Sequence, residues 1–282
     1  MMFKLLPTIG DTVALVGCSN PLNTMYSYQE EHIVRLLSSF GLKVKISPTL
    51  YRESGCQERA QALMDMYLDP QVKAIFDISG GDLALGVLEH LDFDVISNNP
   101  KPMWGYSDLT CVINGIYHRT GNPQVLYSLR NLFLDDTGYQ AKEFEKAMSG
   151  GQELFEPTWH MLQGGGVSGT LVGGNIRCFL KLAGTGLMPD LTDKVLFLES
   201  RSGDAYRIQS MMEQLRLQGA FDKVKGVLIG TFTELDKKLG RDAAVDLIVR
   251  EIGNKDLPIA YTNDVGHGAD SKALVIGQDI SI

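Results

Sequence analysis

The sequence predicts an α/β protein whose amino-terminal part is built on a mainly parallel β-sheet. Short apolar runs of strand length alternate with stretches of helical apolar spacing over the first 120 residues. Strands that alternate with helices of this size form βαβ units, in which the paired strands run parallel. The length of 282 residues allows one large domain or two modest ones.

The elements of the first half follow in a regular order. Strand-like runs lie at residues 13–16, 42–46, 74–78 and 102–105. Helical apolar spacing covers residues 33–40, 60–67, 83–91 and 109–119. In the run at 42–46 apolar residues alternate with lysines, which predicts a strand at or near a sheet edge. Gly41 and Gly121 end two of the helical stretches, as glycine commonly does.

The second half begins after a break in this pattern. Apolar residues show no sustained helical or strand-like spacing between about residues 142 and 166, a segment that contains Pro157 and several glycines. Further strand-like runs lie at 169–172, 195–198 and 227–229, with helical stretches at 208–217 and 243–252. We therefore predict an amino-terminal domain at 1–145, a connection at 146–166 and a carboxy-terminal domain at 167–282.

Composition excludes several classes of function. A formal charge of −8 without a lysine or arginine run argues against nucleic acid and anionic membranes as partners. No apolar stretch approaches the roughly 20 residues of a membrane helix, and the start does not resemble a secretory signal, so a cytoplasmic protein is expected. The four cysteines lie far apart without a CxxC pair, which predicts buried free thiols and no metal site.

Glycine is enriched, with 30 residues or about 11% against a usual value of about 7%. Residues 164–169, Gly-Gly-Gly-Val-Ser-Gly, satisfy the G-x-G-x-x-G fingerprint of dinucleotide binding. That motif needs a strand before it and a helix opening at its end. Here no clear strand leads in and a strand-like run follows, so no bound cofactor is expected.

Ser107 is the strongest candidate nucleophile. It lies in Gly105-Tyr106-Ser107-Asp108, where a predicted strand meets a predicted helix, which is the context of a nucleophile elbow. The amide of Asp108 would then be placed to stabilise an oxyanion. Taken alone, the commoner interpretation is that Ser107 or Asp108 only caps the helix.

A nucleophilic serine needs a base and a group that orients the base. His267 lies between Gly266 and Gly268, whose small size leaves an imidazole accessible on a loop, although a surface turn histidine fits equally well. Glu199 ends the apolar run at 195–198, either as the first solvated residue of the strand or as a buried partner of a histidine.

Together these segments resemble the LD-carboxypeptidase family of serine peptidases, which includes the microcin C self-immunity proteins. The resemblance rests on four segments in the family's order. They are residues 99–110 around Ser107, Val172-Gly173-Gly174-Asn175, Leu196-Phe197-Leu198-Glu199 and Val265-Gly266-His267-Gly268.

The resemblance implies a catalytic triad of Ser107, Glu199 and His267. It also implies an oxyanion hole formed by the amides of Asp108 and of the Gly80-Gly81 turn. It further implies an amino-terminal Rossmann-like domain, a carboxy-terminal β-rich α/β domain, a homodimer and no metal or cofactor.

The expected activity is hydrolysis of an L,D-peptide bond in cytoplasmic murein peptides. Murein-recycling members typically carry Arg-Gly-Gly-Tyr at the first glycine turn. Here the turn reads Ser79-Gly80-Gly81-Asp82 and, with residues 184–189, is closer to the microcin-immunity branch. Cleavage of the amide of a peptidyl-nucleotide antibiotic is therefore an alternative. Rivals from other classes are a non-catalytic ligand-binding Rossmann protein and an NAD-dependent oxidoreductase.

Overall fold

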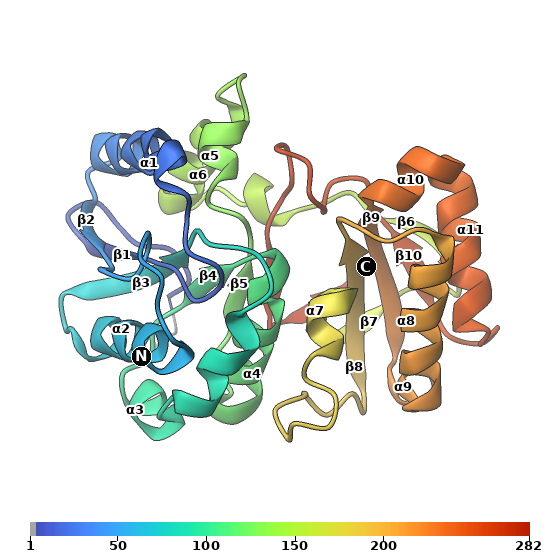
Figure 1. Cartoon of the computed structure of the whole chain (residues 1–282). Helices are drawn as coiled ribbons and strands as arrows, with labels where there is room; N and C mark the ends of the chain where they lie inside the picture. Colours follow the sequence, from blue (N-terminus) through green and yellow to red (C-terminus); the bar gives the residue numbers. More distant parts are fainter. Residues whose placement is uncertain (1–3) are drawn as a thin grey trace.

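The computed structural model describes residues 4–282, which form two six-stranded sheets side by side (Figure 1). Helices pack against both sheets, and α4 (Thr110–Thr120) and α7 (Ile176–Leu180) lie between the two sheets (Figure 1). The fold is therefore a two-domain α/β fold, as the sequence predicted.

The amino-terminal sheet has the strand order β11-β5-β4-β3-β1-β2. Its strands are β1 Thr12–Val16, β2 Lys43–Ile46, β3 Val72–Asp77, β4 Met103–Gly105, β5 Gln124–Leu126 and β11 Leu274–Ile276. β1 to β5 pair in parallel, and only β11 is antiparallel, against β5. β2 lies at the edge, which confirms the prediction from its alternating lysines.

The predicted stretches 33–40, 60–67 and 109–119 match three of the helices described in this domain, and the other α-helices were not predicted. The α-helices of this domain are α1 Ser27–Ser39, α2 Cys56–Leu68, α3 Phe93–Asn98, α4 Thr110–Thr120, α5 Asn131–Leu134 and α6 Tyr139–Met148. Short 3-10 helices lie at Thr24–Tyr26, Ala84–His90, Ser107–Leu109 and Glu153–Phe155.

One predicted helix, at 83–91, has a different geometry, because Ala84–His90 is a 3-10 helix. Gly86 at its centre packs against the first turn of α2, and a Cβ there would lie 3.1 Å from the Cys56 Cβ. Glycine also disfavours an α-helix by about 1 kcal/mol relative to alanine. Close packing at a glycine therefore accompanies the tighter helix.

The carboxy-terminal sheet has the strand order β12-β7-β8-β9-β10-β6. Its strands are β6 His160–Gln163, β7 Ser168–Asn175, β8 Lys194–Ser200, β9 Gly226–Phe232, β10 Ile259–Tyr261 and β12 Asp279–Ser281. Its helices are α7 Ile176–Leu180, α8 Ala205–Leu217, α9 Ala220–Lys223, α10 Thr233–Leu239 and α11 Arg241–Ile252. β7 to β10 are parallel, and antiparallel β12 and β6 form the edges.

The segment between the domains is more ordered than its lack of periodicity indicated. α6 continues to Met148, and its buried face carries Phe144 and Ala147 together with Gln140 and Glu143. β6 pairs with β10 and so belongs to the second sheet. The tail also connects both sheets, because β11 and β12 are separated by two residues and lie in different sheets. The domain limits 1–145, 146–166 and 167–282 stay a prediction.

The glycine fingerprint at 164–169 begins directly after β6 and ends within the first two residues of β7. A strand does lead into it, contrary to expectation, but another strand follows and no helix begins there. The glycines allow close backbone approach instead, since a Cβ on Gly166 would lie 2.9 Å from the Ile282 carbonyl oxygen. The segment therefore lacks the helix N-terminus on which a pyrophosphate would bind.

Candidate active site

The carboxyl ends of strands from both sheets surround one cavity of about 600 Å³. Loops that follow β1, β3, β4, β5 and β8 form much of its wall. Ligands of open α/β sheets commonly bind at this edge. The cavity is lined by Asn20, Pro21, Leu22, Asn23, Gln29, Ser79, Gly80, Gly81, Tyr106, Ser107, Ser128, Arg130, Asn131, Leu134, Arg201, Gly266 and His267.

Ser107 lies in the sharp turn after β4. Its φ of 56° is in the left-handed region, which residues with a Cβ seldom occupy. Tyr106 before it is extended, and the 3-10 helix Ser107–Leu109 runs directly into α4. Such a backbone conformation costs about 1–3 kcal/mol and clusters at functional sites. The strand, turn and helix of a nucleophile elbow are therefore all present.

The alternative that this segment only caps a helix is wrong. Leu109 is the N-cap residue of α4, and no side chain makes a capping hydrogen bond there. The Asp108 carboxylate is fully buried and makes no capping hydrogen bond to α4. It accepts hydrogen bonds from the Ser19 hydroxyl at 2.6 Å and the Ala84 amide at 3.0 Å.

Glu199 and His267 are brought together across the carboxyl end of the second sheet. Nδ1 of His267 lies 2.7 Å from Oε2 of Glu199, and a carboxylate can only accept, so Nδ1–H is the donor. The Glu199 side chain is fully buried at the end of β8. Glu199 is therefore buried beside the histidine and is not a solvated strand end. Nε2 of His267 meets no hydrogen-bond partner within residues 4–282.

Tyr106 supports the same pair and was missed by the sequence analysis. Its ring meets the His267 imidazole edge-on, with centroids 5.0 Å apart. Its hydroxyl is buried, and burial together with the negative charge of Glu199 raises the pKa of Tyr106 well above its ordinary value. The tyrosine therefore stays neutral and limits the orientations open to the imidazole.

The loop that carries His267 depends on close backbone packing. The Gly266 amide donates to the Ser271 hydroxyl at 3.1 Å, and the Thr231 amide donates to the Val265 carbonyl at 2.9 Å. A Cβ on Gly266 would overlap the Thr231 hydroxyl. Glycine at this position therefore lets the histidine loop lie against β9.

The Gly80-Gly81 turn follows β3 and lines the same cavity. Gly81 has a φ of 134°, and a Cβ there would overlap the Asn20 side chain. Asp77, at the end of β3, anchors the turn by accepting from the Cys18 amide at 2.7 Å and the Ser79 amide at 2.8 Å. Burial raises the pKa of Asp77. The structure thus places Gly80, Gly81, Ser107 and His267 on one cavity.

Helix α7 of the second domain braces this arrangement. Lys181, which follows the helix, forms an ion pair with Asp108 and donates to the Asp82 carbonyl at 3.0 Å. Arg177 forms an ion pair with Asp82 and donates to the Gly81 carbonyl at 3.2 Å. The sequence analysis did not find these residues, because their partners lie about 70 to 95 positions away in the chain.

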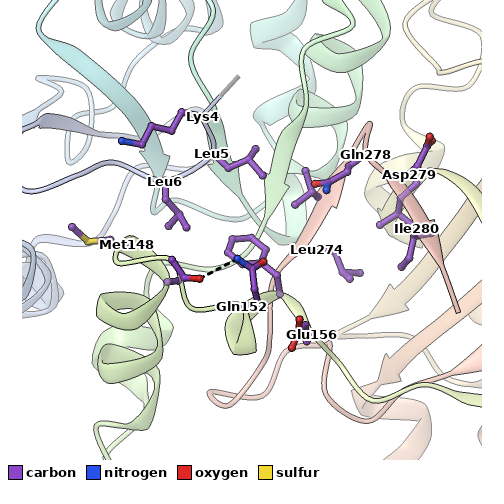
Figure 2. Close-up of a pocket in the computed structure, with 15 residues that line it drawn as sticks. Lys4, Leu5, Leu6, Met148, Gln152, Glu156, Leu274, Gln278, Asp279 and Ile280 are labelled. Carbon is purple, nitrogen blue, oxygen red and sulfur yellow. Dashed lines mark hydrogen bonds between the residues drawn. The ribbon is translucent and has the colours of Figure 1, made fainter. Parts of the chain in front are cut away.

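A second cavity of about 680 Å³ lies away from these groups (Figure 2). Leu5 and Leu6 line one side, Met148 another, and Leu274 and Ile280 from the tail a third (Figure 2). Ser107, Glu199 and His267 do not contribute to it. Its wall is largely apolar and brings together no nucleophile and base, so the smaller cavity is the candidate active site.

The part of the chain that the structure describes gives no support to a metal-binding cluster or a membrane-spanning helix. Residues 4–282 contain no cluster of three or more histidine, cysteine or acidic side chains able to hold a metal ion. No helix among them is long and apolar enough to cross a membrane. Cys18, Cys111 and Cys178 are buried free thiols, as predicted, whereas Cys56 is partly exposed.

Comparisons with known proteins match both halves of the chain to one family. Residues 13–128 match the LD-carboxypeptidase N-terminal domain, and residues 168–282 match the LD-carboxypeptidase C-terminal domain. A probable murein peptide carboxypeptidase of Bacillus subtilis is 27% identical over 95% of this chain and 87% of its own. The microcin C7 self-immunity protein MccF of Escherichia coli is 25% identical over 97% of this chain and 91% of its own.

The fold is also found among solved structures. The microcin C7 self-immunity protein MccF, solved in complex with aspartyl sulfamoyl adenosine, superposes with a TM-score of 0.87 at 23% identity. The superposition covers all of this chain and 96% of the other. Together, the two domain matches and the shared fold show that this chain belongs to the LD-carboxypeptidase family of serine peptidases.

Proposed function

We propose that this protein is a serine carboxypeptidase that hydrolyses an L,D-peptide bond of murein peptides through Ser107, His267 and Glu199. The observation that carries the proposal is the 2.7 Å contact between His267 Nδ1 and the buried Glu199, on the same cavity as the Ser107 turn. The family of the chain and its Bacillus subtilis relative support this substrate class.

In the proposed reaction, Ser107 Oγ attacks the scissile carbonyl carbon and transfers its proton to His267 Nε2. That nitrogen is the ring atom without a partner in the described structure. Glu199 accepts the Nδ1–H and stabilises the imidazolium that forms. The tetrahedral oxyanion accepts hydrogen bonds from the Asp108 amide and from an amide of the Gly80-Gly81 turn.

The second half of the reaction returns the enzyme to its starting state. Collapse of the tetrahedral intermediate breaks the C–N bond, and His267 gives its proton to the departing amine. Water then attacks the carbonyl carbon of the acyl-enzyme, with His267 accepting one of its protons. The second collapse breaks the C–O bond to Ser107, and the Ser107 oxygen takes the proton back from His267. The buried anchors at Asp77 and Asp108 keep both parts of the oxyanion hole in place through these steps.

A second substrate has specific support. The turn Ser79-Gly80-Gly81-Asp82 differs from the murein-recycling pattern, and MccF binds aspartyl sulfamoyl adenosine. The same nucleophile, base and oxyanion hole would cleave the amide between an amino acid and a nucleotide. We therefore retain a peptidyl-nucleotide antibiotic as the alternative substrate.

The experiment that decides between these substrates uses the purified wild-type chain. A murein L,D-tetrapeptide and a peptidyl-adenylate are incubated separately with the enzyme, and the products are identified by mass spectrometry. Release of the C-terminal D-amino acid supports the murein proposal. Cleavage of the adenylate alone supports the alternative, and absence of both products contradicts the proposed function.

The family resemblance also implies a cytoplasmic homodimer, and we include both properties in the proposal. Light scattering coupled to size-exclusion chromatography measures the mass directly. A mass near twice the 31.0 kDa of one chain supports the dimer, whereas a mass of one chain contradicts it. Fractionation of cells that express the protein tests its location.

A further inference from the structure

The charge of the candidate active-site cavity is opposite to that of the protein. The chain carries a formal charge of −8, with 34 acidic residues. None of the residues that line the cavity is an aspartate or a glutamate, and two of them, Arg130 and Arg201, are arginines. A cavity with this lining favours an anionic ligand, because a low-dielectric wall strengthens its attraction to a positive charge.

The two arginines come from different domains. Arg130 precedes α5 in the loop that follows β5, and Arg201 directly follows β8, two positions after Glu199. They are close enough for the charge of Arg201 to lower the pKa of Arg130, for which burial is the larger cause. A ligand held by both guanidiniums would therefore lie between the domains and beside the Glu199–His267 pair.

Neither guanidinium has an acidic partner in the described part of the chain. Arg130 donates one hydrogen bond, to the neutral Gln29 side chain at 3.2 Å. No hydrogen bond or ion pair of the Arg201 side chain is found among residues 4–282. Several arginines elsewhere in the chain form ion pairs with acidic side chains, namely Arg35, Arg52, Arg177, Arg216, Arg241 and Arg250.

A third donor lies next to this pair. Asn131 lines the same cavity and its side chain is almost fully buried, with 4% exposed. Its amide nitrogen meets no acceptor within the described residues. Because a buried donor without an acceptor destabilises the fold, a ligand oxygen that reached Asn131 would offset this cost.

We propose that Arg130 and Arg201 form the subsite for the terminal carboxylate of the peptide substrate. Arginine presents a planar fork of donors that matches the two oxygens of a carboxylate. The released residue of a carboxypeptidase substrate carries this carboxylate one residue beyond the scissile bond. The subsite thereby restricts cleavage to the last residue, and the inference rests on the proposed function.

The test compares binding of an L,D-tetrapeptide with a free carboxyl terminus and of the same peptide as its C-terminal amide. Calorimetric titration into Ser107→Ala measures affinity without turnover. Arg130→Gln and Arg201→Gln are each added to that background. Arg35→Gln serves as the matched control, because Arg35 is an exposed arginine paired with Glu31 on α1, away from the cavity lining.

The free acid is expected to bind Ser107→Ala at least about tenfold more tightly than the amide, since charge-assisted hydrogen bonds are involved. Each cavity Arg→Gln change is expected to reduce this preference, while Arg35→Gln leaves it intact. Equal affinity for acid and amide, or no binding of either, overturns the inference. Retention of the full preference in both cavity variants overturns it as well.

A nucleotide phosphate could use the same donors, so adenosine monophosphate is titrated in parallel. Loss of its binding in the two cavity variants, with peptide binding unchanged, assigns the pair to phosphate and overturns the carboxylate subsite. Turnover by the wild type separates this inference from the proposed function. An intact acid preference without release of the D-amino acid contradicts only the function, and release without any acid preference contradicts only the subsite.

Discussion

His267 Nδ1 lies 2.7 Å from the Oε2 atom of a fully buried Glu199, and this contact fixes which ring nitrogen of the histidine is free to accept a proton. Because Nδ1 donates to the carboxylate, the neutral imidazole has its lone pair on Nε2. Replacement of the carboxylate by an amide removes this control over the tautomer and also removes the charge that stabilises the imidazolium.

Glu199→Gln is therefore expected to lower kcat by about 10²- to 10⁴-fold with little change in KM, because the contact acts mainly in the transition state. The measurement is steady-state kinetics on the L,D-tetrapeptide, with circular dichroism to verify folding. A folded variant that keeps the wild-type kcat would show that Glu199 does not orient the base.

Gly266→Ala is expected to reduce kcat, because the added Cβ would overlap the Thr231 hydroxyl and displace the loop that carries His267. Gly165→Ala is the matched control, since a Cβ there meets nothing within 4 Å. Both variants are compared in kcat and in Tm. Equal kcat for the two variants would contradict the role assigned to the packing of this loop.

Lys181→Met is expected to destabilise the fold and to lower kcat together. Lys181 is the cation paired with the fully buried Asp108 carboxylate. Removal of one partner from a buried ion pair costs about 3–5 kcal/mol, because the remaining charge is uncompensated. Adding Asp108→Asn to this variant should recover part of the stability. The measurement is the free energy of unfolding in denaturant. An unchanged value for Lys181→Met would contradict the stabilising role assigned to the Lys181–Asp108 ion pair.

The burial of Lys101 predicts that the free energy of unfolding depends on pH. Its ammonium donates to the Met66 and Tyr67 carbonyls at the end of α2, at 2.8 and 2.6 Å. Burial lowers the pKa of Lys101 to about 8, from 10.5 for an unperturbed lysine. The unfolded chain therefore binds more protons between about pH 8 and 10.5.

Across that window the free energy of unfolding of the wild type is expected to rise relative to that of Lys101→Met. Denaturant titrations of both proteins at several pH values from 7 to 11 would measure the difference, with roughly one-unit spacing. Below about pH 8 the difference should be constant. A difference that falls as the pH rises through the window would contradict the lowered pKa.

Much of the fold could be predicted because its strands are short apolar runs with regular helices between them. β8 is an example, since Val195 to Leu198 are fully buried and read as a continuous apolar run. The edge strand β6 was missed because its residues, at the rim of the second sheet, are mostly exposed. α6 was missed because charged residues stand on both sides of Phe144, with Lys142 and Glu143 before it and Glu145 and Lys146 after it.

The candidate site was predictable where a residue carries its own local signal. Ser107 follows a strand, and His267 lies between two glycines. Lys181, Arg130 and Arg201 have no such signal, because their importance comes from groups distant in the chain that the fold places beside them. Arg130 and Arg201 come from different domains and line one cavity only because the fold places the two domains side by side.

The central claim is that Ser107 is the nucleophile, and kcat/KM of Ser107→Ala on the L,D-tetrapeptide tests it most directly. Loss of a catalytic serine normally costs several orders of magnitude, so we predict a residual rate below about a hundredth of the wild-type value in a folded variant that still binds the peptide. A folded Ser107→Ala protein that retains more than about a hundredth of the wild-type rate would contradict the account.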